Sequence, residues 1–503
     1  MKFLETLTSL GIGVSEFIAN PSMFLLIIAG VFFGMVFGAI PGLTAALGVT
    51  LILPFTYTMA PGAGLTTLIA IYVGGISGGL ISACLLNIPG SPASLVTCFD
   101  GAPMARNGRP ADALALGVFA SLLGGLFSGV MLIIIAPMLA KVALMFGPWE
   151  YFALGIMGLM VVVSICSNNL VKGLLSAVIG LLLGTVGMDP VSSVQRLTFG
   201  VWQLNGGFAL LATLMGLFAL CEILVQIRDL SVKFDILDTG RIRFFPKKEL
   251  YAGKGKFFGV SAVIGTVIGI LPGIGQSTAS MLAYNTCRQM SKEPEKYGTG
   301  FEEGVIASET ANNAVCGGAL IPMMTLGIPG DTVTAILLGG LVVHGLQPGP
   351  LLFTNNVDIV GIIFIAYILS CVVMYFMEMG LMKMFIKMLK IPLNLLLPII
   401  LVMCVVGTFT TNNRLFDVWV FFFIGILGYI LVCNDFPLGP AVLGYILSKT
   451  IESNMRTGLV SSGGSFMGFF HSPLAVGLVL FGLVLLCLPP IMAARKNRAA
   501  AKQ

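Results

Sequence analysis

Two short motifs that contain Pro-Gly occur twice in the chain, in the same order. Residues 38–44 (GAIPGLT) return as 269–275 (GILPGIG), and residues 86–91 (LNIPGS) return as 326–331 (LGIPGD), each within an otherwise apolar stretch. A helix can be interrupted at membrane depth only where protein or a water-filled cavity satisfies the freed backbone groups. Helices interrupted at matching places in two halves of a chain indicate the binding site of a transporter. The repeated motifs therefore predict a solute carrier with internal two-fold symmetry.

The composition predicts a protein that crosses the membrane many times. Charged residues make up 10% and hydrophobic residues 57% of the 503 residues, and apolar runs recur along nearly the whole chain. A helix needs ~20 apolar residues to cross a bilayer. We predict an all-α polytopic membrane protein with about 12 transmembrane helices in two inverted repeats, some of them re-entrant or broken. The first repeat is 1–227, a basic cytoplasmic linker is 228–256, and 257–503 holds the second repeat and a cytoplasmic C-terminal tail.

The distribution of Lys and Arg predicts the orientation of the repeats. The linker and the C-terminal tail are both rich in basic residues, which the positive-inside rule places in the cytoplasm. The loops after Pro89 and after Pro272 are basic, whereas their counterparts in the opposite halves contain no Lys or Arg. This exchange of basic loops is expected when two repeats are inverted in the membrane.

The first motif of each half is predicted to form the tip of a hairpin. Residues 257–271 would extend only ~22 Å as a helix, less than the ~30 Å of the hydrocarbon core, and basic residues flank the segment on both sides at Lys256 and Arg288. We therefore expect a re-entrant hairpin with Pro272-Gly273 at its tip and, by symmetry, a second one with Pro41-Gly42 at its tip. The alternative is that the Pro-Gly pairs only kink ordinary spanning helices.

Polar groups at these breaks are the candidate binding groups. Free N–H groups at the start of an interrupted helix attract an anion, and free carbonyls at a helix end can hold a cation. Ser91 and Asp331 are also good N-caps, so capping alone is the alternative for both. The predicted substrate-binding residues are Pro41, Gly42, Thr44, Asn87, Pro89, Gly90, Ser91, Pro272, Gly273, Gln276, Ser277, Asn312, Asn313, Pro329, Gly330 and Asp331.

A second group of candidates lies in the apolar run that ends at Pro329. Glu309 is a candidate because ionisable groups near membrane depth are costly and therefore functional by default. The adjacent amides of Asn312 and Asn313 can coordinate Na⁺ or hydrogen-bond a carboxylate, and with Asp331 they are the candidate ligands of a Na⁺ ion. The alternative is that Glu309 and the asparagine pair are solvated at the membrane interface.

Several other classes of protein lack support in the sequence. Two histidines and ten scattered cysteines without a CxxC give no catalytic set and no metal cluster, so we expect neither an enzyme nor a cofactor. The net charge of +5 follows from the basic loops and gives no reason to expect a nucleic acid partner. A channel for ions or anions, with similar re-entrant hairpins, is the alternative from a different functional class.

Six segments of the second half carry a family resemblance: 297–300 (YGTG), 303–305 (EGV), 309–314 (ETANNA), 317–322 (GGALIP), 325–330 (TLGIPG) and 344–350 (HGLQPGP). They resemble the large permease subunit of the bacterial tripartite tricarboxylate transporters. The resemblance extends over essentially the whole chain and is most specific across 257–353, while Thr44 stands where a further glycine would be expected.

The resemblance implies a multi-pass protein of the bacterial inner (plasma) membrane that imports small carboxylates such as citrate by secondary transport. It implies coupling to a cation, with Na⁺ expected and H⁺ as the alternative. It also implies two protein partners, a small membrane subunit and a periplasmic solute-binding protein that delivers the substrate.

Overall fold

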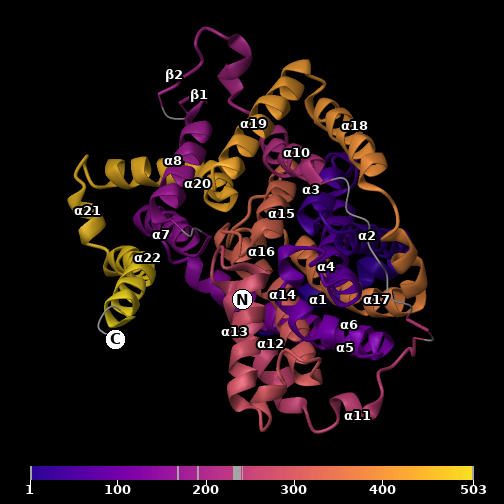
Figure 1. Cartoon of the computed structure of the whole chain (residues 1–503). Helices are drawn as coiled ribbons and strands as arrows, with labels where there is room; N and C mark the ends of the chain where they lie inside the picture. The colour runs from indigo at the N-terminus through magenta and orange to yellow at the C-terminus, as the bar shows by residue number, and fades with distance from the viewer. Residues whose placement is uncertain (1–2, 167–168, 190–191, 230–238, 241, 501–503) are drawn as a thin grey trace. The chain divides into compact units, whose positions relative to one another are not determined.

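The computed structural model describes residues 3–166, 169–189, 192–229, 239–240 and 242–500, and nearly all of them are helical (Figure 1). Within these ranges the strands are one short antiparallel pair, β1 (Gly187–Met188) and β2 (Gln195–Arg196). Part of the predicted basic linker, including Lys233 and Arg241, lies outside the described residues, as do the side chains of the basic C-terminal tail.

The chain folds into two units, and each unit draws on both halves of the sequence. Unit 1 consists of residues 1–141 and 218–413, and unit 2 of residues 142–217 and 414–503. The predicted repeat boundaries at 227 and 257 describe the symmetry of the sequence and stay a prediction. The helices of unit 1 are α1 (Phe3–Ala19), α2 (Ser22–Ala39), α3 (Ala45–Thr56), α4 (Pro61–Leu86), η1 (Pro92–Ser94), η2 (Val96–Phe99), α5 (Gly101–Arg106), α6 (Pro110–Ala143), α10 (Cys221–Gln226), η5 (Ile227–Asp229), α11 (Lys248–Tyr251), α12 (Gly255–Ile270), α13 (Gly275–Met290), η6 (Pro294–Lys296), α14 (Glu302–Leu326), α15 (Thr332–Val343), α16 (Leu352–Asn355), α17 (Val357–Met388) and α18 (Leu393–Asn412). Those of unit 2 are α7 (Pro148–Cys166), α8 (Leu170–Thr185), η3 (Trp202–Gly206), α9 (Leu210–Met215), α19 (Leu415–Cys433), α20 (Leu438–Ser461), α21 (Met467–Phe470) and α22 (Pro473–Ala500). The π-helical segment η4 (Gly216–Leu220) includes residues of both units.

Six of the described helices are long and apolar enough to cross a membrane, namely α2, α4, α6, α17, α18 and α19. Shorter apolar helices of 10–17 residues, such as α3, α12 and α15, accompany them. This mixture is what a polytopic protein with broken helices requires, because a 16-residue helix covers only ~24 Å. The all-helical membrane fold is therefore confirmed, and the number of 12 crossings stays a prediction.

The segment from α12 to α13 is a hairpin. The Lys256 ammonium, at the start of α12, donates to the carbonyl oxygen of Met290, the last residue of α13, over 3.2 Å. Further along, Ser261 Oγ and Cys287 Sγ lie 3.3 Å apart, and Figure 1 shows the two helices side by side. The chain therefore reverses direction at Pro272-Gly273, as the hairpin prediction requires. The alternative of a simple kink is wrong for this segment.

Glycine seams hold the helices around the breaks together. A Cβ atom at Gly38 of α2 would lie 2.1 Å from the carbonyl oxygen of Gly75 in α4, and one at Gly269 of α12 would lie 2.7 Å from that of Val315 in α14. Such close backbone approaches are typical of helix packing in lipid, where small residues replace the hydrophobic effect as the basis of association. The pairs α2–α4 and α12–α14 thus form the same arrangement in the two halves.

The backbone of the hairpin turns repeats between the halves. The residues directly after the helices that precede the turns are Ile40 and Leu271, whose ψ angles are 117° and 120°. Gly42 and Gly273 then adopt positive φ angles of 86° and 74°, a conformation that favours glycine. The symmetry read from the sequence is therefore present in the local geometry.

The breaks at 86–91 and 326–331 repeat in the same way. The helices before them are each followed by a left-handed residue, Asn87 (φ 58°) and Gly327 (φ 69°). Extended residues then follow at Ser91 (φ −141°) and Asp331 (φ −148°). The segments beyond the breaks pack across the repeats, since η1 contacts α13 and α15 contacts α3. All four breaks of the sequence therefore belong to unit 1.

Unit 2 is a smaller helical assembly. Helix α20 packs against α7 and α8, and α22 packs against α7. The crossing of α8 and α20 is a reciprocal glycine contact, because Cβ atoms at Gly180 and Gly444 would lie 1.9 Å and 2.4 Å from the carbonyl oxygens of Ala441 and Ala177. The unit contains none of the predicted site residues.

Candidate functional site

The first hairpin turn is closed by backbone and side-chain contacts. Thr44 caps α3 by accepting a hydrogen bond from the Leu47 N–H over 3.1 Å. A Cβ atom at Gly42 would lie 2.3 Å from Gln226 Oε1, so the Gln226 side chain rests directly against the turn. Gln226 is held in turn by Glu222, which accepts from its Nε2 over 2.8 Å. The turn around Pro41 therefore has a carboxamide and a carboxyl group beside it.

The second hairpin turn connects to both of the other breaks. The Gly273 N–H donates to the carbonyl oxygen of Gly330 over 2.8 Å. Ser277 Oγ, one turn into α13, donates to the carbonyl oxygen of Pro92 over 2.6 Å. The structure thus brings the Pro272-Gly273 turn together with the segments that follow Pro89 and Pro329.

The break at 326–331 ends in a carboxylate whose oxygens are fully engaged. Asp331 is the N-cap of α15, where its Oδ1 accepts from the Thr334 N–H and hydroxyl, each over 2.7 Å. Its Oδ2 accepts from the Tyr72 hydroxyl of α4 over 2.5 Å and from the Gln276 amide of α13. The capping interpretation of Asp331 is confirmed, and the same side chain also ties the two halves of the sequence together.

The break at 86–91 has the same backbone conformation as the break at 326–331, but its side chains form fewer hydrogen bonds. Ser91 is buried, and its backbone N–H donates to Ser94 Oγ over 3.4 Å. The Ser91 side chain faces the Ser94 backbone N–H in a capping box, but its hydroxyl forms no well-aligned hydrogen bond with a described residue. Asn87, at the end of α4, is exposed. This break therefore offers a buried hydroxyl that caps η1 loosely and has no well-aligned partner in the described structure.

Asn312 occupies the position on α14 that Tyr72 occupies on α4, when Leu86 and Leu326 are aligned. α14 packs against η1, which follows Ser91 directly. The Asn312 side chain is fully buried, it lies near the Glu309 carboxylate, and no described donor or acceptor forms a well-aligned hydrogen bond with its amide. Where Tyr72 meets Asp331 in one half, the related positions of the other half hold two polar groups that form no well-aligned hydrogen bond with the described residues.

Glu309 lies in the interior, together with Asn313. Both are almost completely inaccessible, so the alternative of a solvated interface position is wrong for them. Glu309 accepts from the Thr97 hydroxyl and from Ser121 Oγ, the latter over 2.9 Å. Asn313 Nδ2 donates to the same Ser121 Oγ over 2.8 Å. These contacts join α14 to η2 and α6, so that residues of both sequence halves surround one carboxyl group.

The three candidate Na⁺ ligands fall into two separate groups. Asp331 is bonded to Tyr72, Gln276 and Thr334, whereas Asn313 is bonded to Ser121 and Glu309, and no described hydrogen bond joins the groups. Within the described ranges no cluster of three or more His, Cys, Asp or Glu side chains could hold a metal ion. A Na⁺ site would therefore have to use hydroxyl, amide and backbone oxygens of one group or the other.

Glu378 is a residue that the sequence reasoning missed. It lies on α17, is 0% exposed, and its Oε2 accepts from Ser77 Oγ of α4 over 2.6 Å. The signal was present, because a carboxyl group inside the 32-residue apolar helix Val357–Met388 is a functional candidate by default. Tyr72 gave no comparable signal, because its role depends on contact with Asp331.

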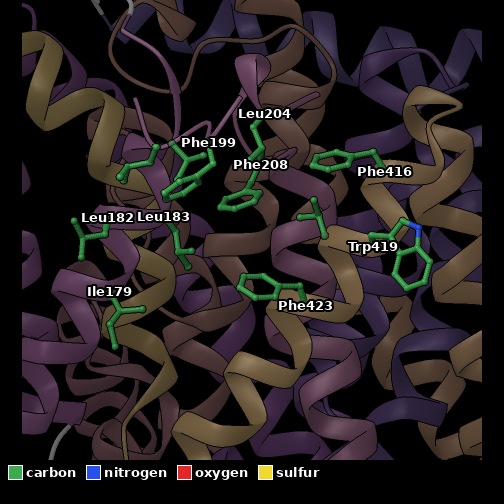
Figure 2. Close-up of a pocket in the computed structure, with 12 residues that line it drawn as sticks. Ile179, Leu182, Leu183, Phe199, Leu204, Phe208, Phe416, Trp419 and Phe423 are labelled. Atoms are coloured by element: carbon green, nitrogen blue, oxygen red, sulfur yellow. The ribbon is translucent and has the colours of Figure 1, made fainter. Parts of the chain in front are cut away.

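Unit 2 contains a pocket of a different kind, with a volume of about 490 Å³ (Figure 2). Its lining is aromatic and aliphatic, with Phe199, Phe208, Phe416, Trp419 and Phe423 among the residues drawn. Carboxylates need charged or hydrogen-bonding partners when they leave water. An apolar lining of this type offers a carboxylate nothing of the kind, so the candidate site for a polar solute is in unit 1.

Comparison with known proteins finds similar proteins in Agrobacterium vitis. A curated protein of Agrobacterium vitis, described as an uncharacterised 52.8 kDa protein of the TAR-I ttuC′ 3′ region, is 33% identical over 508 residues, which cover 99% of this chain and 100% of that protein. A second protein of the same organism, from the TAR-II ttuC′ 3′ region, is 33% identical over 234 residues, 46% of this chain and 97% of its own. No solved structure matches the chain.

The family model of the tripartite tricarboxylate transporters matches residues 24–443, a range that includes all four breaks and the buried residues Glu309 and Glu378. The predicted resemblance is thereby confirmed. The chain is a multi-pass membrane protein that belongs to the tripartite tricarboxylate transporter TctA family, a family of transporter subunits.

Proposed function

We propose that this protein is the large membrane subunit of a secondary transporter that imports small carboxylates such as citrate, driven by a cation gradient. In this proposal it lies in the bacterial inner membrane with its C-terminus in the cytoplasm. A periplasmic binding protein delivers the substrate, and a small membrane subunit completes the complex. The division of labour among three proteins follows the name of the family.

The observation that carries the proposal is the state of two buried polar groups of the first-half break and its equivalent helix position, Ser91 and Asn312. Ser91 Oγ and the Asn312 amide are buried without well-aligned hydrogen bonds among the described residues, and unpaired polar groups of this kind are costly unless a ligand uses them. Both groups can donate to a carboxylate. The Asp331 oxygens already accept four hydrogen bonds, so we place the substrate at Ser91 and Asn312.

The charge of the substrate requires compensation in this proposal. Helices α2, α3, α4, α14 and α15 contain no Lys or Arg. Neutral donors and the N-terminal ends of helices are then left to bind the anion. A cation that enters with the substrate would supply the remaining positive charge, which is the physical reason to expect coupling.

Uptake into proteoliposomes tests the proposal. The protein is reconstituted with the small subunit, and labelled citrate and other di- and tricarboxylates are offered with and without the binding protein, under a Na⁺ gradient, a proton gradient or neither. We expect saturable accumulation that needs both the binding protein and one of the gradients. Non-saturable flux that is indifferent to every gradient would favour the channel and reject the carrier.

A further inference from the structure

Two buried carboxyl groups in unit 1 lie near each other without a basic partner. Glu309 on α14 and Glu378 on α17 are both 0% exposed, and they are close enough for their charges to repel. Within the described structure, neither makes an ion pair. Among the described side chains, the titratable or charged groups packed against α17 are Glu16 on α1, Tyr72 and Cys84 on α4, Asp112 and Lys141 near the ends of α6, and Arg243 beside Phe244. Burial of two ionised carboxylates without a partner is very costly, so at least one of them must carry a proton or bind a cation.

The two carboxyl groups differ in how many donors they receive. Glu309 accepts from the Thr97 hydroxyl, from Ser121 Oγ over 2.9 Å and from Asn313 Nδ2 over 3.4 Å. Hydrogen bonds donated to a carboxylate favour its charged form. Glu309 is therefore the better place for the negative charge.

Glu378 receives a single donor. Ser77 Oγ donates to its Oε2, whereas its Oε1 is buried and has no hydrogen-bond partner in the described part of the chain. An ionised carboxylate would leave that oxygen both charged and unpaired, which is expensive away from water. A proton on Glu378 removes the charge and also the repulsion from Glu309.

From this asymmetry we infer that Glu378 takes up and releases the coupling proton, while Glu309 remains ionised as the fixed charge beside it. The step is a proton transfer alone, from the carboxylate plus H⁺ to the carboxylic acid and back. Its role in transport rests on the proposed function, but the protonation itself can be measured without any substrate.

The location of the pair suits coupling to the substrate site. Glu309 lies one helical turn from Asn312 on α14, and Ser77, the donor to Glu378, lies on the same helix as Tyr72. Helices α4 and α14 therefore each carry one residue of the proton site and one residue at the breaks. A change in protonation of Glu378 can bias the same two helices that hold the breaks in place.

Infrared difference spectroscopy on the purified protein tests the protonation directly. A pH titration of the wild type should show the carbonyl stretch of a buried, protonated carboxyl group disappear as the pH rises. The band should be absent from Glu378→Gln and present in Glu309→Gln. It should also be present in Glu303→Gln, a control on α14 in which the replaced carboxyl, bonded to the Tyr297 hydroxyl, lies at the start of the helix.

Three spectroscopic results would overturn the inference: no such band in the wild type, loss of the band in Glu309→Gln but not in Glu378→Gln, or removal of the wild-type band when Na⁺ replaces choline at constant pH. The last result would show that the pair binds Na⁺ in place of a proton.

Transport measurements then distinguish a failure of this inference from a failure of the proposed function. With labelled citrate, or the other carboxylate that the wild type accumulates best, Glu378→Gln should exchange substrate across the membrane at near the wild-type rate but fail to accumulate it. Proton-driven accumulation by Glu378→Gln would overturn the inference and leave the carrier intact. Absence of any carboxylate uptake by the wild type would overturn the proposed function and leave the spectroscopic result standing.

Discussion

The breaks at 86–91 and 326–331 share a backbone and differ in their side chains. In both, a left-handed residue ends a long helix, an isoleucine, a proline and a glycine follow, and an extended polar residue precedes the next helix. In each break the backbone N–H of that polar residue donates to a hydroxyl three residues later, Ser94 Oγ over 3.4 Å and Thr334 Oγ1 over 2.9 Å. Both polar residues also face the next helix in a capping box, but the Asp331 side chain accepts four hydrogen bonds, whereas the Ser91 hydroxyl forms no well-aligned one with the described residues.

This difference shows how one repeated backbone can serve two purposes. In the second half, Tyr72 and Gln276 fill the break and tie α4 and α13 to α15, so the break acts as a structural junction. In the first half, the corresponding groups form no well-aligned hydrogen bond with the described residues, and we propose that the substrate binds them. Symmetric scaffolds with asymmetric side chains allow a carrier to hold a substrate on one side of a pseudo-two-fold axis without a second, competing site.

The largest expected effect tests what the breaks have in common. A Cβ atom at Gly330 would lie 2.4 Å from the carbonyl oxygen of Gly269, and one at Gly90 would lie 2.2 Å from that of Gly38. Because the obstacle is backbone in both cases, Gly330→Ala and Gly90→Ala should each destabilise the protein by about 3 kcal/mol or prevent folding. The yield of monodisperse protein and its thermal unfolding measure this.

The control for this pair is Gly259→Ala on α12, where an added Cβ would meet nothing within 4 Å. It should fold and transport normally. If only one of Gly330→Ala and Gly90→Ala remained as stable as the wild type, the packing of the two breaks would not be equivalent.

The second prediction compares how much stability the protein loses when Asp331 or Ser91 is replaced by alanine. Asp331→Ala removes a helix cap and leaves the Tyr72 and Gln276 donors unpaired, so it should lower the free energy of unfolding by about 3 kcal/mol. Ser91→Ala removes a hydroxyl that makes no well-aligned hydrogen bond with the described residues. This variant should change the free energy of unfolding by less than about 0.5 kcal/mol. Equal losses, measured by thermal unfolding in the same detergent, would contradict the distinction between junction and open site.

The third prediction compares the two equivalent helix positions. Tyr72→Phe removes one donor to a buried carboxylate and should cost about 1.5 kcal/mol of stability. Asn312→Leu replaces a buried amide of similar volume that lacks a well-aligned hydrogen bond, and it should be neutral or stabilising while uptake falls. A large loss of stability in Asn312→Leu would mean that the amide has a structural partner.

The smallest effect is expected in the kinetics of uptake. If the Ser91 hydroxyl donates to a substrate carboxylate, Ser91→Ala should raise the KM of carboxylate uptake about 10-fold, the equivalent of ~1.4 kcal/mol, with little change in the amount of folded protein. Ser91→Thr keeps a hydroxyl group and should retain most of the affinity. An unchanged KM in Ser91→Ala would remove Ser91 from the site and leave the break to backbone groups alone.

The sequence by itself determined the repeated motifs, the breaks they produce and the hairpin from α12 to α13. These features are local, because Pro removes a backbone donor, Gly permits positive φ, and the length of an apolar run limits what it can span. The candidate residues next to the breaks, among them Ser91, Gln276 and Asp331, could be read from the same motifs. Glu309 and the asparagine pair could be selected because polar groups are rare in apolar runs.

Only the tertiary structure decided which of these residues meet. Tyr72 and Asp331 are 259 residues apart in the chain, and Ser77 and Glu378 are 301 residues apart. Such pairs depend on how α4, α14 and α17 pack, which no local pattern encodes. The structure also grouped the chain into units that each combine both sequence halves. A hydrogen bond between residues so far apart in the chain depends on the glycine contacts that hold the helices together. For this reason the sequence predicts the breaks, while the fold determines the chemistry between them.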